Sequence, residues 1–182
     1  MVKQDVSFWE VYAKATYTVN DNLSFGGSVF YSPNVLNSGA DGTYVAGTIK
    51  YIFPNAPLPK DVGMFISADV GHWFLGTSDA FWCTQVAGFC GGSFPTGIPY
   101  TSYTNWDVGL AFTYKVFTLD LRYSDTSLSK ASCNAFTSDY STTNFSPSFV
   151  SAINPGGFGS NWCGAAGVAK LSADLTAITN LK

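Results

Sequence analysis

The sequence predicts an all-β protein: an antiparallel up-and-down transmembrane β-barrel, with about seven strands in this chain. Three observations indicate this fold. Apolar and polar side chains alternate with a period of two, turn residues interrupt the alternation, and the connections are alternately short and long. The clearest stretch is N-W-D-V-G-L-A-F-T-Y-K-V-F-T-L-D-L-R-Y-S-D-T at 105–126, whose two alternating segments around a tight turn predict a β-hairpin with one apolar face.

The same alternation recurs along the chain and predicts the other strands. In the first, Trp9, Val11 and the residues that follow at every second position are apolar, and N-D-N at 20–22 is a turn signal. The last segment is weaker, and a helix is its alternative because Leu171, Leu175 and Ile178 would share one helical face. The predicted strands are 9–19, 23–32, 44–53, 62–71, 105–114, 118–126 and about 165–177.

The connections alternate in length along the predicted sheet. In an up-and-down sheet, the connections after odd-numbered strands lie at one end and those after even-numbered strands at the other. Short turns at one end and long loops at the other are the plan of bacterial outer-membrane barrels, although a soluble up-and-down barrel can share it. The short connections are 20–22, 54–61 and about 115–117, and the long ones are 33–42, 75–104 and 126–163.

Composition limits the class of protein. At 182 residues, 1–182 is expected to be a single domain, and no apolar run approaches the ~18 residues of a spanning helix. Charged residues make up 12% of the chain, about half of the ~25% usual for soluble domains. The net charge is −3 and there is no run of lysine and arginine, so we expect no nucleic-acid partner.

The polar side of the predicted strands suits a hydrated lumen better than bulk water. It carries glycine, alanine, serine and threonine with isolated charges of both signs, where a face in bulk water would be densely charged. Five acids and five bases indicate no strong ion selectivity. The expected pore-lining residues are Glu10, Lys14, Lys50, Asp69, Asp107, Lys115, Asp120, Arg122, Lys170 and Asp174.

The apolar side of the predicted strands is aromatic near the strand ends. Eight residues at ~3.3 Å each, tilted by ~40°, cover ~20 Å, close to the ~25 Å apolar band of outer-membrane barrels. Tryptophan and tyrosine favour the membrane interface, whereas aromatic enrichment is also common in ordinary strands. The expected lipid-interface aromatics are Trp9, Tyr17, Phe25, Tyr31, Tyr51, Phe74, Trp106, Tyr114, Phe117 and Tyr123.

Several stretches, in this order, resemble the proteobacterial TorF-type porin family. They are F-W-E-V-Y-A-K-A-T-Y-T-V-N-D-N-L-S-F-G-G-S-V-F-Y-S-P-N-V-L-N-S-G-A-D-G-T-Y-V-A-G-T-I-K-Y, then D-V-G-H-W-F, Y-T-N-W-D-V-G-L-A-F-T-Y and L-D-L-R-Y-S-D-T. The resemblance covers 8–126, and 164–175 more loosely, but not the cysteine-bearing loops. It implies an outer-membrane β-barrel of about twelve strands that passes small solutes, and the family's N-terminal third has no counterpart here.

Four cysteines lie in the two longest loops, in segments rich in glycine, serine, threonine and asparagine. An even number of loop cysteines favours disulfides in an oxidising compartment, with free thiols in a cytosolic protein as the alternative, and their wide spacing and the single histidine argue against zinc. Of the three connectivities that four cysteines allow, the one within each loop needs the fewest assumptions. We therefore expect Cys83 to pair with Cys90, and Cys133 with Cys163.

Catalytic motifs are scarce. S-x-x-K at 127–130 lacks the companion motifs S-D-N and K-T-G of penicillin-recognising enzymes, and a polar loop is the alternative. His72, which could serve as a base, falls on the apolar side beside Trp73, where an interfacial position is expected. We expect no enzymatic activity, no cofactor and no metal.

Three functions stay open at this level. The first is a passive outer-membrane porin with a mixed-charge lumen, whose partners are outer-membrane lipid, small solutes, and in addition a homo-oligomer or larger membrane assembly. The second is a closed structural barrel whose inward charges pair across strands. The third is a secreted soluble β-protein that binds a ligand or partner.

The strand directions carry one further expectation. If the long loops are extracellular, the first strand descends from outside, whereas outer-membrane barrels begin and end in the periplasm and have an even number of strands. The sequence therefore predicts an odd number of strands before Met1, about five by the resemblance, and no direct pairing of the first strand with the seventh.

Overall fold

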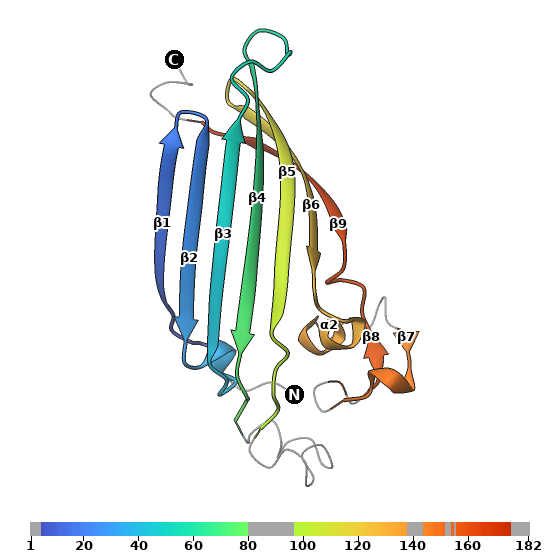
Figure 1. The fold of residues 1–182 in the computed structure, drawn as a ribbon. Helices are drawn as coiled ribbons and strands as arrows, with labels where there is room; N and C mark the ends of the chain where they lie inside the picture. The colour runs from blue at the N-terminus through green and yellow to red at the C-terminus, as the bar shows by residue number, and fades with distance from the viewer. Residues whose placement is uncertain (1–4, 80–96, 138–143, 152–153, 155, 176–182) are drawn as a thin grey trace.

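The structure is a computed structural model that describes residues 5–79, 97–137, 144–151, 154 and 156–175. Seven strands form one antiparallel sheet in the order β1-β2-β3-β4-β5-β6-β9 (Figure 1). Strands β1 to β6 follow one another both along the chain and across the sheet, and β9 then pairs with β6, as expected for an up-and-down meander. The strands are β1 (Val11–Asn20), β2 (Leu23–Ser32), β3 (Gly42–Ile52), β4 (Val62–Leu75), β5 (Tyr103–Tyr114), β6 (Phe117–Thr126) and β9 (Ala166–Ala173).

The smaller elements lie in the long connections. The 3-10 helix η1 (Val35–Asn37) joins β2 to β3. Between β6 and β9 lie the helix α2 (Lys130–Thr137), the 3-10 helix η2 (Pro147–Phe149) and a two-stranded sheet of β7 (Asn144–Phe145) and β8 (Phe158–Gly159). None of the helices in the described part of the chain is long and apolar enough to cross a membrane.

The predicted strands are confirmed, with small shifts at their ends. The sheet-forming alternation continues beyond the predicted ends of β4, which runs to Leu75, and β5, which begins at Tyr103. The weak last segment is a strand over Ala166–Ala173, so the helical alternative is wrong there: pairing with β6 outweighs the helical spacing of the leucines. The short turns lie at one end of the sheet and the long connections at the other, as predicted (Figure 1).

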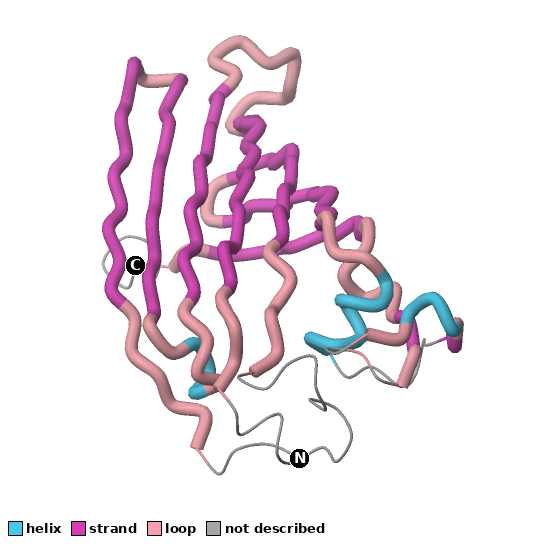
Figure 2. Tube along the Cα trace, turned by 60° about the horizontal axis from the view of Figure 1, so that its bottom comes forward, coloured by secondary structure: helices cyan, strands magenta, loops and turns pink. Residues whose placement is uncertain are grey.

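The two faces of the sheet differ in chemistry and in exposure. We call the side of Ser67, Asp69, Asp107 and Arg122 the inner face, and the opposite side the outer face. Along β6 the outer apolar residues are exposed and the inner polar residues are partly covered, in strict alternation. Figures 1 and 2 show a twisted sheet in which β6 and β9 are strongly tilted relative to β1–β3. The sheet therefore curls around its polar face.

An apolar core is almost absent from the described part of the chain. Its buried hydrophobic residues are Ala40, Ala111 and Cys133, each 1% exposed. Large apolar side chains are instead exposed over the outer face. Besides aromatic residues, the exposed outer positions in the strands include Val19, Val29, Val45, Ile49, Ile66, Val70, Val108, Leu119, Leu121 and Leu171.

The described sheet is open. Strand β1 pairs only with β2, and β9 only with β6, so the two edge strands do not hydrogen-bond to each other. All ten residues of β1 are exposed. The absence of direct pairing between the first and last strands agrees with the sequence, whereas a closed barrel is not seen among the described residues.

The connection between β6 and β9 is held by a disulfide. Cys133 in α2 is bonded to Cys163, as predicted, with an S–S distance of 2.10 Å. The predicted partner pair, Cys83 and Cys90, lies outside the described residues. Around the bond, Thr126 Oγ1 donates to the carbonyl of Cys163 at 2.7 Å, and the Ser160 amide donates to the carbonyl of Lys130 at 2.9 Å. These contacts join α2 and β8 to the end of β6.

We expect the double variant Cys133→Ala/Cys163→Ala to loosen this connection without unfolding the sheet. The bond closes a segment with a sequence separation of 30, for which chain entropy gives a stabilisation of about 3–4 kcal/mol. Limited proteolysis should cut between residues 127 and 165 faster in the variant, while the circular dichroism of the sheet is retained. Equal cleavage rates in the two proteins would contradict this role.

Candidate functional site

A cluster of charged side chains lies on the inner face, at the centre of β4, β5 and β6. Its members are Asp69 on β4, Asp107 on β5, and Asp120 and Arg122 on β6. The strand register brings them together. Asp69 is paired with Asp107, and Arg122 is paired with Gly109, which is the next residue after Asp107 on the same face of β5. Four of the ten predicted pore-lining residues therefore form one cluster.

Arg122 is the centre of this cluster. Its Nη1 donates to Asp107 and lies 3.4 Å from Asp69 Oδ2, and its Nη2 donates to Asp120 Oδ2 at 3.2 Å. Nη2 also donates to Ser67 Oγ at 2.7 Å. The arginine has room because it lies across Gly109, where an added Cβ would come within 3.0 Å of the guanidinium carbon.

The cluster has an excess of negative charge and is partly covered. Three carboxylates surround one guanidinium, and the arginine side chain is 24% exposed. Hydrogen bonds between ionised partners are stronger than neutral ones, and a planar guanidinium can bind several carboxylates at once. This geometry can brace three strands, and it leaves carboxylate oxygens that a passing cation could meet.

The other predicted pore-lining residues are dispersed. Lys14 and Lys50 lie on the inner face, where each ammonium lies over aromatic rings, Lys50 at 4.1 Å from the centroid of Phe65. Lys170 is opposite Asp120 in the register of β6 and β9. The last three lie outside the strands: Glu10 directly precedes β1, Asp174 directly follows β9, and Lys115 is in the turn between β5 and β6, with a positive φ of 54°.

The ten predicted lipid-interface aromatics are all exposed. Nine of them lie in strands, and Trp9 lies just before β1. Their exposed fractions range from 38% for Tyr51 to 70% for Tyr17. Trp106 and Tyr123 contact each other across β5 and β6, with ring centroids 5.4 Å apart. His72, also on this face, is hydrogen-bonded through Nδ1 to Thr104 Oγ1 at 2.8 Å and packs on Phe74.

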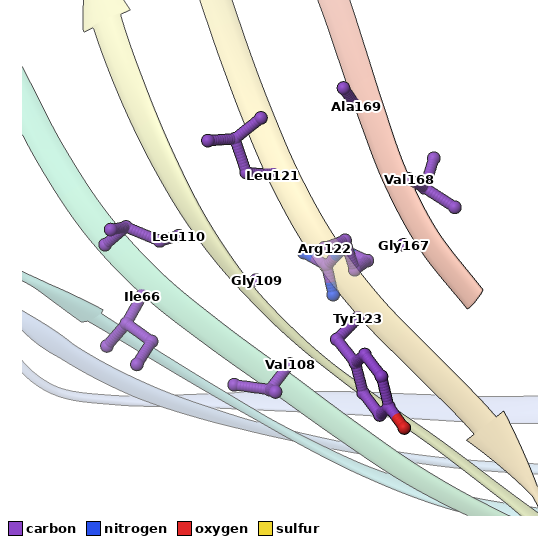
Figure 3. A pocket seen from close by; sticks show the side chains of 10 residues that line it. All are labelled: Ile66, Val108, Gly109, Leu110, Leu121, Arg122, Tyr123, Gly167, Val168 and Ala169. Carbon is purple, nitrogen blue, oxygen red and sulfur yellow. The ribbon is translucent and has the colours of Figure 1, made fainter. Parts of the chain in front are cut away.

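The outer face is hollowed where small residues interrupt the large ones. A shallow depression of about 530 Å³ lies across β4, β5, β6 and β9, and Figure 3 shows the residues that line it. The residues that line it include Val108, Leu110, Leu121, Tyr123 and Gly167. A second depression, of about 570 Å³, lies where Gly47 and Ala68 adjoin Phe25 and Trp106. Both belong to the apolar outer surface and carry no catalytic constellation.

A row of aromatic rings on the inner face is absent from the sequence interpretation. It begins with Tyr12 on β1 and continues onto the next strands with Phe30, Tyr44 and Trp73, which are paired in register. All four lie at alternating positions that belong to the polar face, whereas the predicted lipid-interface aromatics lie on the apolar face. The alternation places them inside, but only the strand register shows that they adjoin.

In the described part of the chain, no group of three or more His, Cys, Asp or Glu could hold a metal ion. The S-x-x-K segment is partly structural: the amide of Thr104 donates to Ser127 Oγ at 2.9 Å, and Lys130 begins α2.

In comparisons with known proteins, no family model, no curated protein and no solved structure matches the chain.

Proposed function

We propose that this protein is a bacterial outer-membrane β-barrel that passes small solutes passively along its inner face. The observation that carries the proposal is the inversion of exposure: apolar side chains cover the outer face, and polar and charged side chains line the inner one. A soluble domain of this length can bury a large apolar core. An apolar surface of this extent needs a covering phase, and lipid supplies one.

The strand dimensions support the same proposal. Strands β1 to β6 have 10 to 14 residues, and a tilted strand needs about 9–11 to cross a bilayer. In lipid, the free edges of β1 and β9 would cost several kcal/mol for each unpaired backbone group. We therefore propose that further strands, from another segment or another chain, pair with these edges and close a barrel of about twelve strands.

The inner face favours a weakly selective pore. Among the strand residues described on this face, four bases (Lys14, Lys50, Arg122 and Lys170) stand beside three acids (Asp69, Asp107 and Asp120). Nearly balanced charge gives little discrimination between anions and cations. A closed structural barrel is the second candidate, because the Arg122 cluster joins three strands in the manner of an internal brace.

Conductance in a planar lipid bilayer tests the proposal. We expect the purified protein, in its natural full-length form and refolded, to give stepwise current increments in KCl with a reversal potential near zero in a salt gradient. Lys50→Glu should shift that potential towards cation selectivity, because Lys50 is exposed on the inner face, where its ammonium lies over the ring of Phe65.

Two outcomes separate the candidates. Heat-dependent migration on SDS gels without any conductance would favour the closed structural barrel. Neither heat-dependent migration nor insertion into bilayers would contradict both membrane functions and leave the secreted soluble protein. Arg122→Glu is not an equivalent probe, because it also breaks the cluster.

A further inference from the structure

Five neighbouring strands each place one aromatic ring at the same level of the inner face. The register pairs Tyr12 with Phe30, Phe30 with Tyr44, Tyr44 with Trp73, and Trp73 with Tyr103. We call these five residues the inner aromatic row. The row lies four residues, about 13 Å along the strands, from Asp69 and Asp107, towards the end that carries the long connections.

The rings of the row contact one another from Tyr12 to Trp73. Tyr12 and Phe30 are stacked, with centroids 5.5 Å apart, and Phe30 and Tyr44 are 6.1 Å apart. The Tyr44 and Trp73 rings approach to 4.9 Å. A continuous apolar strip thus crosses a face that otherwise carries mainly glycine, alanine, serine, threonine and charged side chains.

Tyr44 is fixed in place within the row. The hydroxyl end of its ring lies over Gly71, where an added Cβ would clash with the hydroxyl oxygen. Its hydroxyl also accepts a hydrogen bond from Asn105 Nδ2 at 3.2 Å. A ring held from below and from the side loses little conformational entropy when a ligand stacks against it.

One end of the row carries a positive charge. Lys14 Nζ lies 4.9 Å from the Phe30 centroid and 5.3 Å from that of Tyr12. The inner carboxylates of Asp69, Asp107 and Asp120 are on β4–β6 and are bound by Arg122, whereas Lys14 is on β1. The ammonium of Lys14 lies over the rings of Tyr12 and Phe30, whereas the carboxylate of Glu10 belongs to the residue that precedes β1, on the other side of Tyr12.

We infer that the inner aromatic row and Lys14 bind solutes that combine a flat apolar ring with a carboxylate, that is, aromatic carboxylates. The ring would stack on the aromatic row, and the carboxylate would pair with the Lys14 ammonium. This inference rests on the proposed function, since it names the solute class for the same inner face. Aromatic cations fit less well because Lys14 repels them, and aliphatic carboxylates lack the ring.

The test uses sodium benzoate as the probe, with sodium acetate and benzyltrimethylammonium chloride for comparison. Binding to the refolded full-length protein is measured by calorimetry, and uptake by the swelling of proteoliposomes. We expect benzoate to bind about tenfold more tightly than acetate, as the stacking of one ring would give. It should bind more tightly than benzyltrimethylammonium as well, whose ring can stack but whose positive charge Lys14 repels. We also expect benzoate to enter faster than its size relative to acetate predicts.

Two pairs of variants distinguish benzoate binding at the inner aromatic row from general effects of removing a ring or a charge elsewhere in the sheet. Tyr44→Leu removes a row ring, and Tyr51→Leu removes an exposed outer ring of the same strand. Lys14→Gln removes the charge at the row, and Lys50→Gln removes the other inner lysine of β1–β3. We expect the first member of each pair to weaken benzoate binding by about fivefold to tenfold, and the second to leave it unchanged. Lys14→Glu should reverse the preference towards benzyltrimethylammonium.

Equal affinity for benzoate and acetate would overturn the inference, as would equal losses in the two members of each pair. Lys14 is exposed, so its variants test the inference even if Tyr44→Leu fails to fold. Benzoate binding without KCl conductance would contradict the pore and support the binding site. KCl conductance without a preference for benzoate would contradict the binding site alone.

Discussion

Replacing Val108 with arginine is expected to destabilise the membrane-inserted protein by about 2–4 kcal/mol. Val108 lies midway along β5 on the outer face, is 38% exposed, and is opposite Ala68 and Tyr123 in register. If lipid covers this face, the arginine must enter the hydrocarbon layer or draw water into it. Urea unfolding in lipid vesicles measures the loss.

Thr48→Arg is the matched control for this substitution. Thr48 is exposed, lies at a similar level of the sheet, and faces inward opposite Asp69. An arginine there would enter the proposed lumen beside a carboxylate and should cost less than 1 kcal/mol. Equal and small effects at the two positions would indicate that the outer face meets water.

Removing the charge of Arg122 is expected to have the second large effect. Arg122→Met leaves Asp69, Asp107 and Asp120 close together without the guanidinium that they share. Loss of these charged hydrogen bonds, together with repulsion among the carboxylates, should destabilise the barrel by about 2–3 kcal/mol at neutral pH, less than for a fully buried network because the cluster is partly hydrated. The same variant should favour cations over anions in conductance.

The pH dependence of the destabilisation by Arg122→Met tests whether its origin is electrostatic. Protonation of carboxylates in acid removes both the ion pairs of the native cluster and the repulsion in the variant. The difference in unfolding free energy between Arg122→Met and the native protein should therefore shrink at acid pH. Arg122→Lys keeps the charge without the planar fork and should recover only part of the stability. A difference that stays constant with pH would contradict an electrostatic origin.

The sequence predicts the sheet well because its signal is local. Alternation along each strand fixes which side chains share a face, and turn residues fix where strands end, so seven strands and their two faces follow directly. The Cys133–Cys163 bond is also predictable, since both cysteines lie within one connection. The alternative helix near Leu171 could not be excluded locally, because only pairing with β6 decides it.

The site is less predictable because it depends on register between strands. Asp69, Asp107, Asp120 and Arg122 are recognisable as inward charges, but their convergence on one guanidinium requires the alignment of three strands. The inner aromatic row is hidden for the same reason. Lys115 illustrates the opposite case: its parity suggests a lumen position, whereas it lies in the turn that joins β5 to β6.

The most direct test of the account is quenching of tryptophan fluorescence by lipids with brominated acyl chains. Single tryptophans would be placed, in a variant without native tryptophans, at the outer positions Ile66 and Leu121 and at the inner positions Ser67 and Ser124. Brominated acyl chains should quench the two outer probes strongly and the two inner probes weakly, since only the outer face is proposed to meet hydrocarbon. Equally weak quenching at all four positions in vesicle-bound protein would contradict a lipid-facing outer surface, and with it the proposed membrane barrel.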